Sequence, residues 1–402
     1  MFGFDENQQF VGKGIKMDTI EKWSLELRNA GRLLPELENI SSAASAFNAN
    51  IDAIVNIDGR VLSELLKKRA VSRQFLQHYK ARNAETFDEA LCGIFKCFSA
   101  GIAEEWTSSN PNLCGEILDI FKPKKMQIGG QGGIIANLLS ICKIQNVAVH
   151  TNSLPKIQSA QFLPHKNLRG FDENGNTKQI SQICRSKDVP LIHIIFEFQK
   201  DDEIIVDDKI FVCPKSNRFI MSCDELNQKL ITDENFMQYM AKNPQNYCFL
   251  SGFHLLTSKN AQNVLPKIKN EMIKWKLDAQ KDCILHLEIA STSDNKVLKM
   301  IIDEIAQNVD SIGLNEREAI DVMQILNPQE IFAPAAVDMF KAMLLLRQYT
   351  KAPRIELHML GIFMTIQDKK FKQTPIQAKN GMLLAARISA SRAKLGDLKK
   401  YD

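Results

Sequence analysis

The sequence lacks the features of a membrane-spanning, secreted or nucleic-acid-binding protein. No stretch reaches the ~18 uninterrupted apolar residues of a membrane span. The first residues, MFGFDENQQFVGKGIKMD, contain early acids and no apolar segment of the kind that marks a secretory signal. The 51 basic and 47 acidic residues leave a formal net charge of only +4, with no clustered basic stripe. We therefore expect no membrane and no nucleic-acid partner.

Cysteine motifs are absent as well. The nine cysteines are odd in number, and none forms a CxxC pair or a Cys/His metal pattern. Buried thiols in a reducing compartment are the favoured interpretation, so we predict a cytoplasmic location. Apolar content of 45% and charged content of 24% are typical of an ordinary globular protein. Length alone does not decide between one domain and two.

Short apolar runs alternate with longer amphipathic stretches along most of the chain. Cys283–Ala290 and Arg354–Phe363 predict strands, whereas Asp294–Asn308 and Glu316–Leu326 predict helices. This alternation predicts an α/β fold with a mostly parallel sheet. Residues 190–222 depart from it, because three strand-like runs follow one another without a helix. We expect them to form a β-rich layer away from the main sheet, as a flap over a ligand would.

Two polar motifs near strand ends are candidates for ligand binding. Ile128–Leu139 (IGGQGGIIANLL) places four glycines just before a helix, where backbone N–H groups can approach an oxygen-rich or anionic ligand. A plain tight turn is the simpler interpretation, since the motif is neither G-x-G-x-x-G nor a Walker A sequence. The strand ending in FNANIDAI places Asn48, Asn50 and Asp52 on one face. Solvent at a sheet edge or a ligand at the strand end would equally satisfy them.

Acidic residues at two later strand ends predict either helix capping or a cation site. Glu288 lies in the apolar run ILHLEIAS, where a charge is costly unless it is paired or bound to a cation. The spacing of Asn315 and Glu318 by itself favours a helix cap. Taken together, oxygen ligands from successive strand ends are what Mg²⁺ bound to phosphates requires. His193 and His358, each alone in an apolar strand, are by themselves better interpreted as core residues.

The order of these motifs resembles the archaeal ADP-dependent glucokinase and phosphofructokinase family of the ribokinase-like superfamily. The matching motifs are, in chain order, AFNANIDAIVNI, IGGQGGIIANLL, IIFEF, NRFIMS, LSGFHLLT, HLEIASTSD, VDSIGLNEREA and RIELHMLGIF. They span about Ala46 to Phe363, and GMLLAARISASRAKLGD extends the similarity to Asp397. One motif alone would not be specific, but their succession over most of the chain is.

The resemblance implies a three-layer α/β/α ribokinase-like body with a mostly parallel sheet, plus a smaller β-rich lid. A single kinase domain would cover residues 1–402. Residues 190–222 would form part of the lid, and its other segments would lie within 52–122 and 151–190. The implied reaction transfers the β-phosphoryl group of ADP to fructose 6-phosphate, glucose or both, and releases AMP. Mg²⁺ would assist, since such a transfer needs positioning and charge neutralisation more than covalent chemistry.

The resemblance also implies roles for individual residues. The residues that would bind the sugar are Asn50, Asp52, Glu105, Gly130, Gln131 and His193. Glu104 is an alternative to Glu105. Glu288 and Glu318 would support Mg²⁺, directly or through water, while Asn315 would lie by the nucleotide phosphates and His358 near the nucleotide.

The end of the sequence departs from the family pattern. The family places its G-x-G-D segment, with the catalytic aspartate and an anion hole, well after the helix that GMLLAARISASRAKLGD resembles. The LGD at Leu395–Asp397 matches an earlier, non-catalytic LGD, so we do not assign Asp397 as the base. The general base would lie beyond Asp402, and this chain would have little activity. The alternative is a sugar-binding pseudokinase, which the intact sugar and metal motifs disfavour.

The sequence does not decide between glucose and fructose 6-phosphate as the phosphoryl acceptor. Glu105 stands where strict phosphofructokinases have a small residue. Cys223 and Asp224 follow Ser222, whereas phosphofructokinases often have an arginine after a serine-alanine pair at this place. Both departures favour glucose, or dual use of glucose and fructose 6-phosphate. AFNANIDAIVNI and IGGQGGIIANLL, in contrast, are closer to the phosphofructokinase branch.

Overall fold

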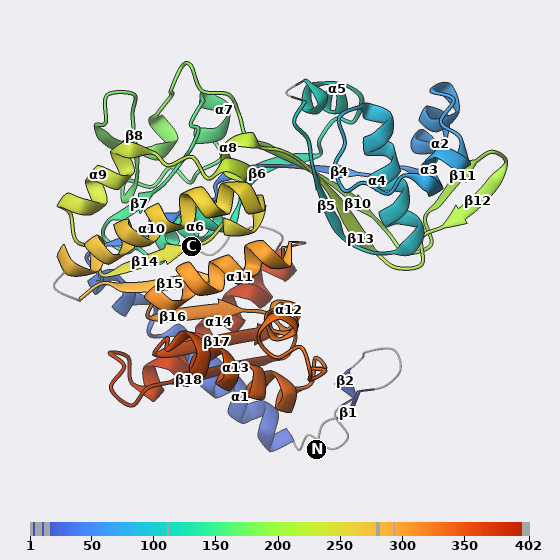
Figure 1. The fold of residues 1–402 in the computed structure, drawn as a ribbon. Helices are drawn as coiled ribbons and strands as arrows, with labels where there is room; N and C mark the ends of the chain where they lie inside the picture. The colour runs from blue at the N-terminus through green and yellow to red at the C-terminus, as the bar shows by residue number, and fades with distance from the viewer. Residues whose placement is uncertain are drawn as a thin grey trace.

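Two separate β-sheets organise the chain in the computed structural model, which describes residues 3–4, 10–11, 17–110, 112–278, 282–292 and 294–395. The larger sheet has the strand order β18-β17-β16-β15-β14-β3-β7-β8-β9 (Figure 1). Its strands are β3 (Ala43–Ala46), β7 (Val147–Val149), β8 (Leu168–Phe171), β9 (Thr177–Gln179), β14 (Tyr247–Leu250), β15 (Ile284–Glu288), β16 (Ser311–Leu314), β17 (Arg354–Met359) and β18 (Ile362–Gln367). All neighbours in it are parallel except the pairs β8–β9 and β17–β18.

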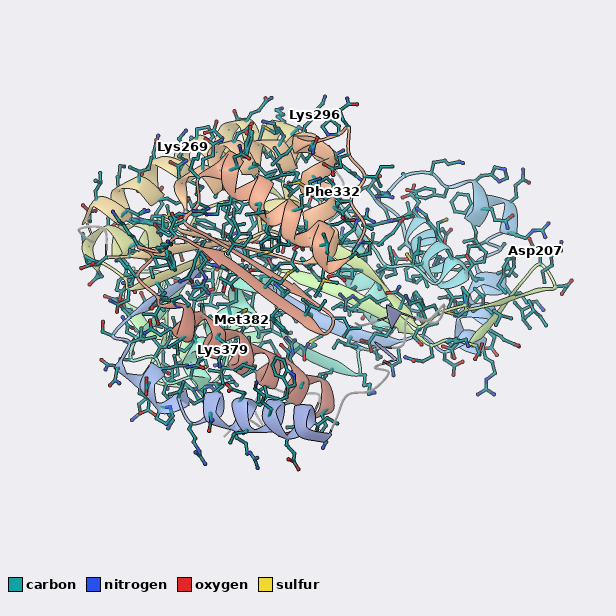
Figure 2. All side chains as sticks on the ribbon, turned by 90° about the horizontal axis from the view of Figure 1, so that it is seen from below. Asp207, Lys269, Lys296, Phe332, Lys379 and Met382 are labelled. Atoms are coloured by element: carbon teal, nitrogen blue, oxygen red, sulfur yellow. A yellow bond between two sulfur atoms is a disulfide. The ribbon has the colours of Figure 1, made fainter. Side chains whose placement is uncertain are left out.

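Helices cover both faces of this sheet, and we call the whole assembly the body. Figure 2 shows the helices that carry Lys269 and Lys296 on one side, and the helix that carries Lys379 and Met382 on the other. The body helices are α1 (Met17–Gly31), α6 (Gln131–Ile141), α7 (Lys156–Ser159), α8 (Glu225–Lys229), α9 (Glu234–Lys242), α10 (Ser258–Asp278), α11 (Asn295–Glu304), α12 (Glu316–Leu326), α13 (Ala336–Thr350) and α14 (Pro375–Leu395). The body therefore has the mostly parallel sheet expected from the alternating sequence and the three α/β/α layers implied by the family resemblance.

The smaller sheet, with the strand order β5-β13-β10-β4-β6, forms the second lobe in Figure 1. Its strands are β4 (Asn50–Asn56), β5 (Glu104–Thr107), β6 (Lys125–Gly129), β10 (Ile192–Phe198) and β13 (Asn217–Cys223). We call this sheet the lid, together with α2 (Gly59–Lys68), α3 (Arg73–His78), α4 (Phe87–Ala100), α5 (Leu113–Ile120) and the hairpin β11 (Glu203–Val206)–β12 (Lys209–Val212). Residues 168–179, within a range where we expected lid segments, instead pair in the body as β8 and β9.

Strand alternation divides the lid sheet into an apolar face and a polar face. In β4 the buried residues Ile51, Ala53 and Val55 belong to the lid core, together with residues of α2, α4 and α5. Asn50 and Asp52 lie between them and project to the opposite face. The helices thus cover one face only, which leaves the other available for polar chemistry.

Two further expectations are corrected. Arg354–Phe363 is not one strand but a hairpin, because Gly361 has φ of +79°, a conformation that turns the chain between β17 and β18. The cysteines are not all buried thiols: Cys114 of α5 and Cys223 of β13 form a disulfide, and Cys184 is exposed. Alternation explains the disulfide, since Cys223 projects to the helix-covered face. None of the helices in the described ranges has the length and apolarity needed to cross a bilayer.

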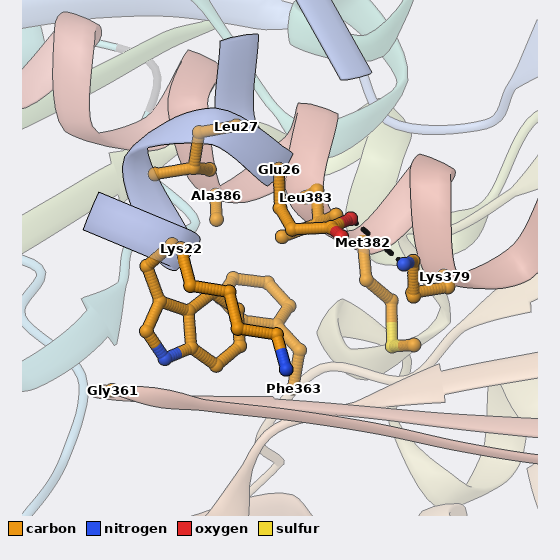
Figure 3. A pocket seen from close by; sticks show the side chains of 10 residues that line it. Lys22, Glu26, Leu27, Gly361, Phe363, Lys379, Met382, Leu383 and Ala386 are labelled. Carbon is orange, nitrogen blue, oxygen red and sulfur yellow. Dashed lines mark hydrogen bonds and ion pairs between the residues drawn. The ribbon is translucent and has the colours of Figure 1, made fainter. Parts of the chain in front are cut away.

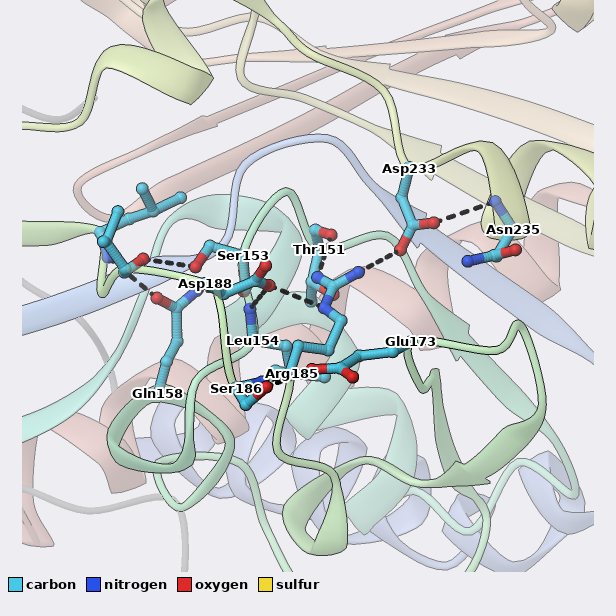
Figure 4. A network of polar contacts seen from close by, with 12 residues as sticks. Thr151, Ser153, Leu154, Gln158, Glu173, Arg185, Ser186, Asp188, Asp233 and Asn235 are labelled. Carbon is cyan, nitrogen blue, oxygen red and sulfur yellow. Dashed lines mark hydrogen bonds and ion pairs between the residues drawn. The ribbon is translucent and has the colours of Figure 1, made fainter.

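Buried polar contacts join the lid to the body. Gln158 of α7, labelled in Figure 4, donates through Nε2 to the carbonyl of Ala49 (3.2 Å). Its Oε1 accepts from the N–H of Leu191 (3.0 Å), so it holds the chain just before both β4 and β10 begin. Nearby, Arg185 forms ion pairs with Asp188 (2.8 Å) and Asp233 (3.0 Å). These contacts satisfy backbone groups where the chain passes between sheets, so they fix the strand positions that the site depends on.

Candidate active site

A group of charged side chains lies on the polar face of the lid sheet. Asp52 of β4 and His193 of β10 are direct neighbours across the parallel pairing, so both project to the same face. His193 Nε2 lies 3.1 Å from Asp224 Oδ2, and its Nδ1 lies 3.6 Å from Glu105 Oε1. Glu105 also accepts a 2.5 Å hydrogen bond from Ser222 Oγ. A buried histidine is therefore surrounded by three carboxyl groups, which we call the His193 cluster.

The charges of the His193 cluster shift its acid–base equilibria. Burial by itself disfavours the imidazolium, but the hydrogen bond to Asp224 and the charge of Glu105 outweigh it and raise the pKa of His193 to about 9. Burial raises the pKa of Asp52, although the His193 charge and the 2.9 Å hydrogen bond from Asn50 Nδ2 oppose that shift. His193 is accordingly a cation at neutral pH and presents N–H groups as donors.

The glycine motif faces the same polar group. A Cβ on Gly129 would lie 1.9 Å from Asp52 Oδ1, so glycine at this position of β6 leaves room for the Asp52 carboxyl group of the neighbouring strand β4. Gly130 has φ of +69°, and a Cβ there would meet Asn50 Oδ1 at 2.7 Å. Gln131 then begins α6. Asn50 Oδ1 and Gln131 Oε1 are both buried without a hydrogen-bond partner, which leaves acceptors for a ligand that carries hydroxyl groups.

A second polar group lies at the strand ends of the body. Glu288 ends β15, and its Oε2 would be only 2.1 Å from a Cβ on Gly313 of the neighbouring strand β16. His286 Nε2 lies 3.1 Å from Glu288, and His358 Nε2 lies 3.6 Å from it. The glycine thus lets the Glu288 carboxylate lie across β16, between two imidazoles.

Asn315 and Glu318 form a capping box at the start of α12. Asn315 Oδ1 accepts from the Glu318 N–H (3.0 Å), and Glu318 Oε2 accepts from the Asn315 N–H (2.8 Å). Burial raises the pKa of Glu318 to about 8, and the nearby charge of Glu288 adds to the shift, against the hydrogen bond from the Asn315 N–H. The capping interpretation of this spacing is therefore correct. The carboxyl of Glu318 also accepts a hydrogen bond from the backbone of Ser291, and it lies near enough to Glu288 for that charge to affect its pKa.

A cleft of about 820 Å³ separates the lid from the body. From the lid it is lined by Glu105 and Arg218, and from the body by His254, Ser291 and Asp321, among others. His254 belongs to the short helix η3 (Phe253–Leu255), and Glu105 is a member of the His193 cluster, so that cluster borders the cleft through Glu105. The lid and the body thus contribute polar residues to a single space.

The family can now be assigned. A sequence model of the ADP-specific phosphofructokinase/glucokinase conserved region matches residues 41–401. The chain belongs to the ADP-specific phosphofructokinase/glucokinase family. Its members are phosphotransferases with ADP as the phosphoryl donor. This confirms the family resemblance that the ordered motifs indicated.

Two relatives from Pyrococcus represent the two activities in the family name. The ADP-dependent glucose/glucosamine kinase of Pyrococcus furiosus is 28% identical over 392 residues, which cover 94% of this chain and 82% of the relative. The ADP-specific phosphofructokinase of Pyrococcus horikoshii is 27% identical over 379 residues, which cover 90% of this chain and 83% of the relative.

A solved structure supports the fold of this family member. The last common ancestor of ADP-dependent phosphofructokinases from Methanosarcinales superposes with a TM-score of 0.77 at 23% identity, covering 94% of this chain and 82% of that one. The ribokinase-like fold expected from the sequence is confirmed.

The structure refines some of the residue assignments in this family member. It brings Glu105 to His193, whereas Glu104 is bound by Lys96 Nζ (2.9 Å) and Trp106 Nε1 (2.8 Å). Sequence reasoning missed Asp224 as a site residue. Asp224 stands out in the sequence only as a departure from the phosphofructokinase pattern, and its contact with His193 depends on the fold. Asp397 lies outside the described residues.

A further cavity, of about 620 Å³, lies between α1, α14 and β18 (Figure 3). Its lining is mainly apolar and includes Trp23, Phe363 and Met382, with an ion pair of 2.8 Å between Glu26 and Lys379 at its side. It contains none of the residues predicted for the sugar, nucleotide or metal. The interlobe cleft is therefore the candidate active site.

Proposed function

We propose that the protein transfers the β-phosphoryl group of ADP to a hydroxyl of a hexose bound in the cleft between lid and body. The observation that supports this most strongly is the cleft itself, to which the lid contributes Glu105 of the His193 cluster and the body contributes His254, Ser291 and Asp321. The His193 cluster with Asn50, Gly130 and Gln131 supplies acceptors and donors for sugar hydroxyls. Relatives named for glucose, glucosamine and phosphofructokinase activity support the same reaction class.

On the body side, we propose that Asn315 lies by the nucleotide phosphates and His358 near the nucleotide. The N-terminus of α12, which Asn315 caps, offers N–H groups and a positive dipole end to phosphate oxygens. His358 is partly exposed and lies close enough to Glu288 to help fix that carboxylate.

We propose Mg²⁺ as the cofactor, held through Glu288 with support from Glu318. Among the described residues, no three His, Cys, Asp or Glu side chains converge as a complete metal cage. Mg²⁺ in phosphoryl-transfer sites needs fewer protein ligands, because it keeps waters and binds the substrate phosphates. The buried Glu318 carboxyl beside Glu288 fits this role, since a cation would relieve their repulsion. When bound, Mg²⁺ would neutralise charge on the transferred phosphoryl group.

The test is AMP release from ADP with glucose or fructose 6-phosphate as acceptor. The assay compares the 402-residue chain with one extended by the G-x-G-D segment of a related complete kinase. We expect turnover with ADP and not ATP, and at least 10²-fold more in the extended chain. Sugar binding without AMP release in both chains would contradict the proposal and indicate a sugar-binding protein. The cytoplasmic location remains a prediction.

A further inference from the structure

The Cys114–Cys223 disulfide lies directly behind the His193 cluster in the lid sheet. Cys223 ends β13 and projects to the helix-covered face, where it is bonded to Cys114 of α5. Its two neighbours in the chain take part in the hydrogen bonds of the cluster. Ser222 donates to a carboxylate of the cluster, and Asp224 lies 3.1 Å from its imidazole. The disulfide therefore fixes the one residue that separates these two contacts.

The disulfide also lies where the chain passes from the lid to the body. Asp224, directly after Cys223, caps α8, which belongs to the body (Figure 1). The Cys114 sulfur lies 4.0 Å from the carbonyl oxygen of Ile192, which begins β10 and pairs with Cys223 across the sheet. A covalent bond to α5 thus holds the end of β13 beside the start of β10, where both strands meet the body.

The other cysteines indicate that this disulfide is reversible. All seven are free thiols, and in the reducing compartment that the sequence predicts, a single disulfide is typically redox-active and not permanent. Cys223 is only partly buried, so a small dithiol can reach its sulfur. Burial raises the pKa of the lid thiols Cys92 and Cys97 to about 12, which keeps both protonated and unable to exchange with the disulfide.

We propose that the Cys114–Cys223 pair is a redox switch of the sugar site: the disulfide holds the His193 cluster in its binding geometry, and reduction weakens sugar binding. The inference rests on the proposed function and adds a regulation of that same site.

The switching step is a thiol–disulfide exchange with an external dithiol, which supplies two electrons and two protons. One thiolate of the dithiol attacks the Cys223 sulfur, and the Cys114 sulfur leaves as a thiolate that takes up a proton. The second thiolate then attacks the mixed disulfide. This frees Cys223 as a thiol and leaves the reductant as a cyclic disulfide.

Reduction changes the distance that the two sulfur atoms can keep. Two thiols are no longer covalently bonded and need van der Waals separation, so Cys223 moves away from α5. Ser222 and Asp224 are joined to Cys223 in the chain, so their hydrogen bonds in the His193 cluster lose alignment. The aromatic core around Phe219 does not involve the disulfide, so the lid stays folded. The expected change is therefore local to the cluster.

The test is glucose affinity at neutral pH, measured by calorimetry on the oxidised protein and after reduction with dithiothreitol. Reduction should weaken glucose binding about fivefold or more, as the loss of one hydrogen bond does. Reoxidation with oxidised glutathione should restore it. ADP affinity and the far-UV circular dichroism spectrum should not change, because the lid stays folded and the proposed nucleotide site lies on the body.

Two variants identify the cysteines responsible. A double variant with Cys114→Ser and Cys223→Ser should bind glucose as weakly as the reduced protein and should not respond to dithiothreitol. Cys184→Ser is the matched control, because Cys184 is exposed and free, and its glucose affinity should respond to dithiothreitol as the unmodified protein does. Should the double variant fail to fold, the comparison of oxidised and reduced unmodified protein decides.

Equal glucose affinity in the oxidised and reduced proteins would overturn the inference. A disulfide that dithiothreitol reduces only as the lid unfolds would overturn it as well, because the bond would then be a permanent crosslink. A dithiothreitol response that disappears in Cys184→Ser would assign the effect to another thiol and contradict the inference.

NMR of the His193 ring protons, assigned with the His193→Gln variant, follows the cluster without any sugar. A protein that binds no glucose and releases no AMP, but whose His193 signals shift on reduction, would contradict the proposed function and support the control of the cluster by the disulfide. A protein that releases AMP, with glucose affinity and His193 signals independent of the redox state, would do the reverse.

Discussion

Two buried histidines, His193 in the lid and His150 in the body, have opposite electrostatic surroundings. His193 is enclosed by carboxyl groups, which keep it protonated with a pKa of about 9. His150 accepts a 2.9 Å hydrogen bond from the backbone N–H of Asp233 and packs edge-on against Phe47 and Phe236. Burial lowers its pKa to about 4, although the charge of Asp233 opposes this.

The difference indicates a separate role for each histidine. His150 serves packing, because its neutral imidazole accepts a backbone N–H through Nε2 among aromatic rings, while its Nδ1 is buried without a hydrogen-bond partner. In contrast, a buried cation among carboxylates is costly for stability unless every partner is in place, and such groups concentrate at functional sites. The comparison therefore supports the proposal that the polar face of the lid is the functional side of the molecule. The following predictions test it.

The largest expected effect is a loss of stability in the lid alone. The Cys114–Cys223 disulfide closes a segment of 109 residues, so Cys114→Ser should lower the stability of the lid by about 2–4 kcal/mol. Hydrogen exchange should then show faster exchange of lid amides than of body amides. Cys184→Ser is the control, since Cys184 is exposed and free. A uniform loss of protection across both lobes would show that lid and body do not unfold separately.

The second prediction concerns pH and stability. The pKa of His150 is below its unfolded value, so its contribution is complete above about pH 6.5 and is lost as the pH falls toward 4. The pKa of His193 is above its unfolded value, so its contribution is complete below about pH 6.5 and is lost as the pH rises through about 9. Each shift corresponds to at most about 3 kcal/mol. In urea titrations, His150→Gln should flatten the acid side of the stability profile, and His193→Gln the alkaline side. If both variants flatten the same side of the stability profile, the two histidines do not have opposite electrostatic surroundings.

The third prediction tests sugar binding. Asp52→Ala should weaken glucose or fructose 6-phosphate binding at least tenfold by calorimetry, since each hydrogen bond to a charged group contributes about 1.5–3 kcal/mol. Asn56→Ala provides the control, because Asn56 lies at the far end of β4 on the same face. Unchanged affinity in Asp52→Ala would remove Asp52 from the site.

The smallest expected effect concerns the cation. Glu288→Gln should abolish the Mg²⁺-dependent tightening of ADP binding and leave glucose affinity unchanged. This variant leaves Arg218 and the other lid residues unchanged. Its glucose affinity therefore serves as the internal reference. If ADP binding never depends on Mg²⁺, Glu288 serves only to pair with His286 and His358.

Local patterns in the sequence determined several parts of this structure. The alternation in NIDAI determined that Asn50 and Asp52 share a face, because side chains in a strand repeat every two residues. The spacing of Asn315 and Glu318 determined the capping box, which involves one turn of helix. Gly130 is required locally as well, since its positive φ excludes most other residues.

Tertiary structure alone decided which of these groups meet. Glu105, His193 and Asp224 come from three separate segments, and only the strand order β5-β13-β10-β4 brings them together. The Cys114–Cys223 disulfide and the placement of β8 and β9 in the body likewise depend on contacts between residues distant in sequence. The physical reason is that periodicity and capping are set by neighbours within a few residues. Charge environments, in contrast, depend on which strands lie side by side, and that is decided only when the two cores form.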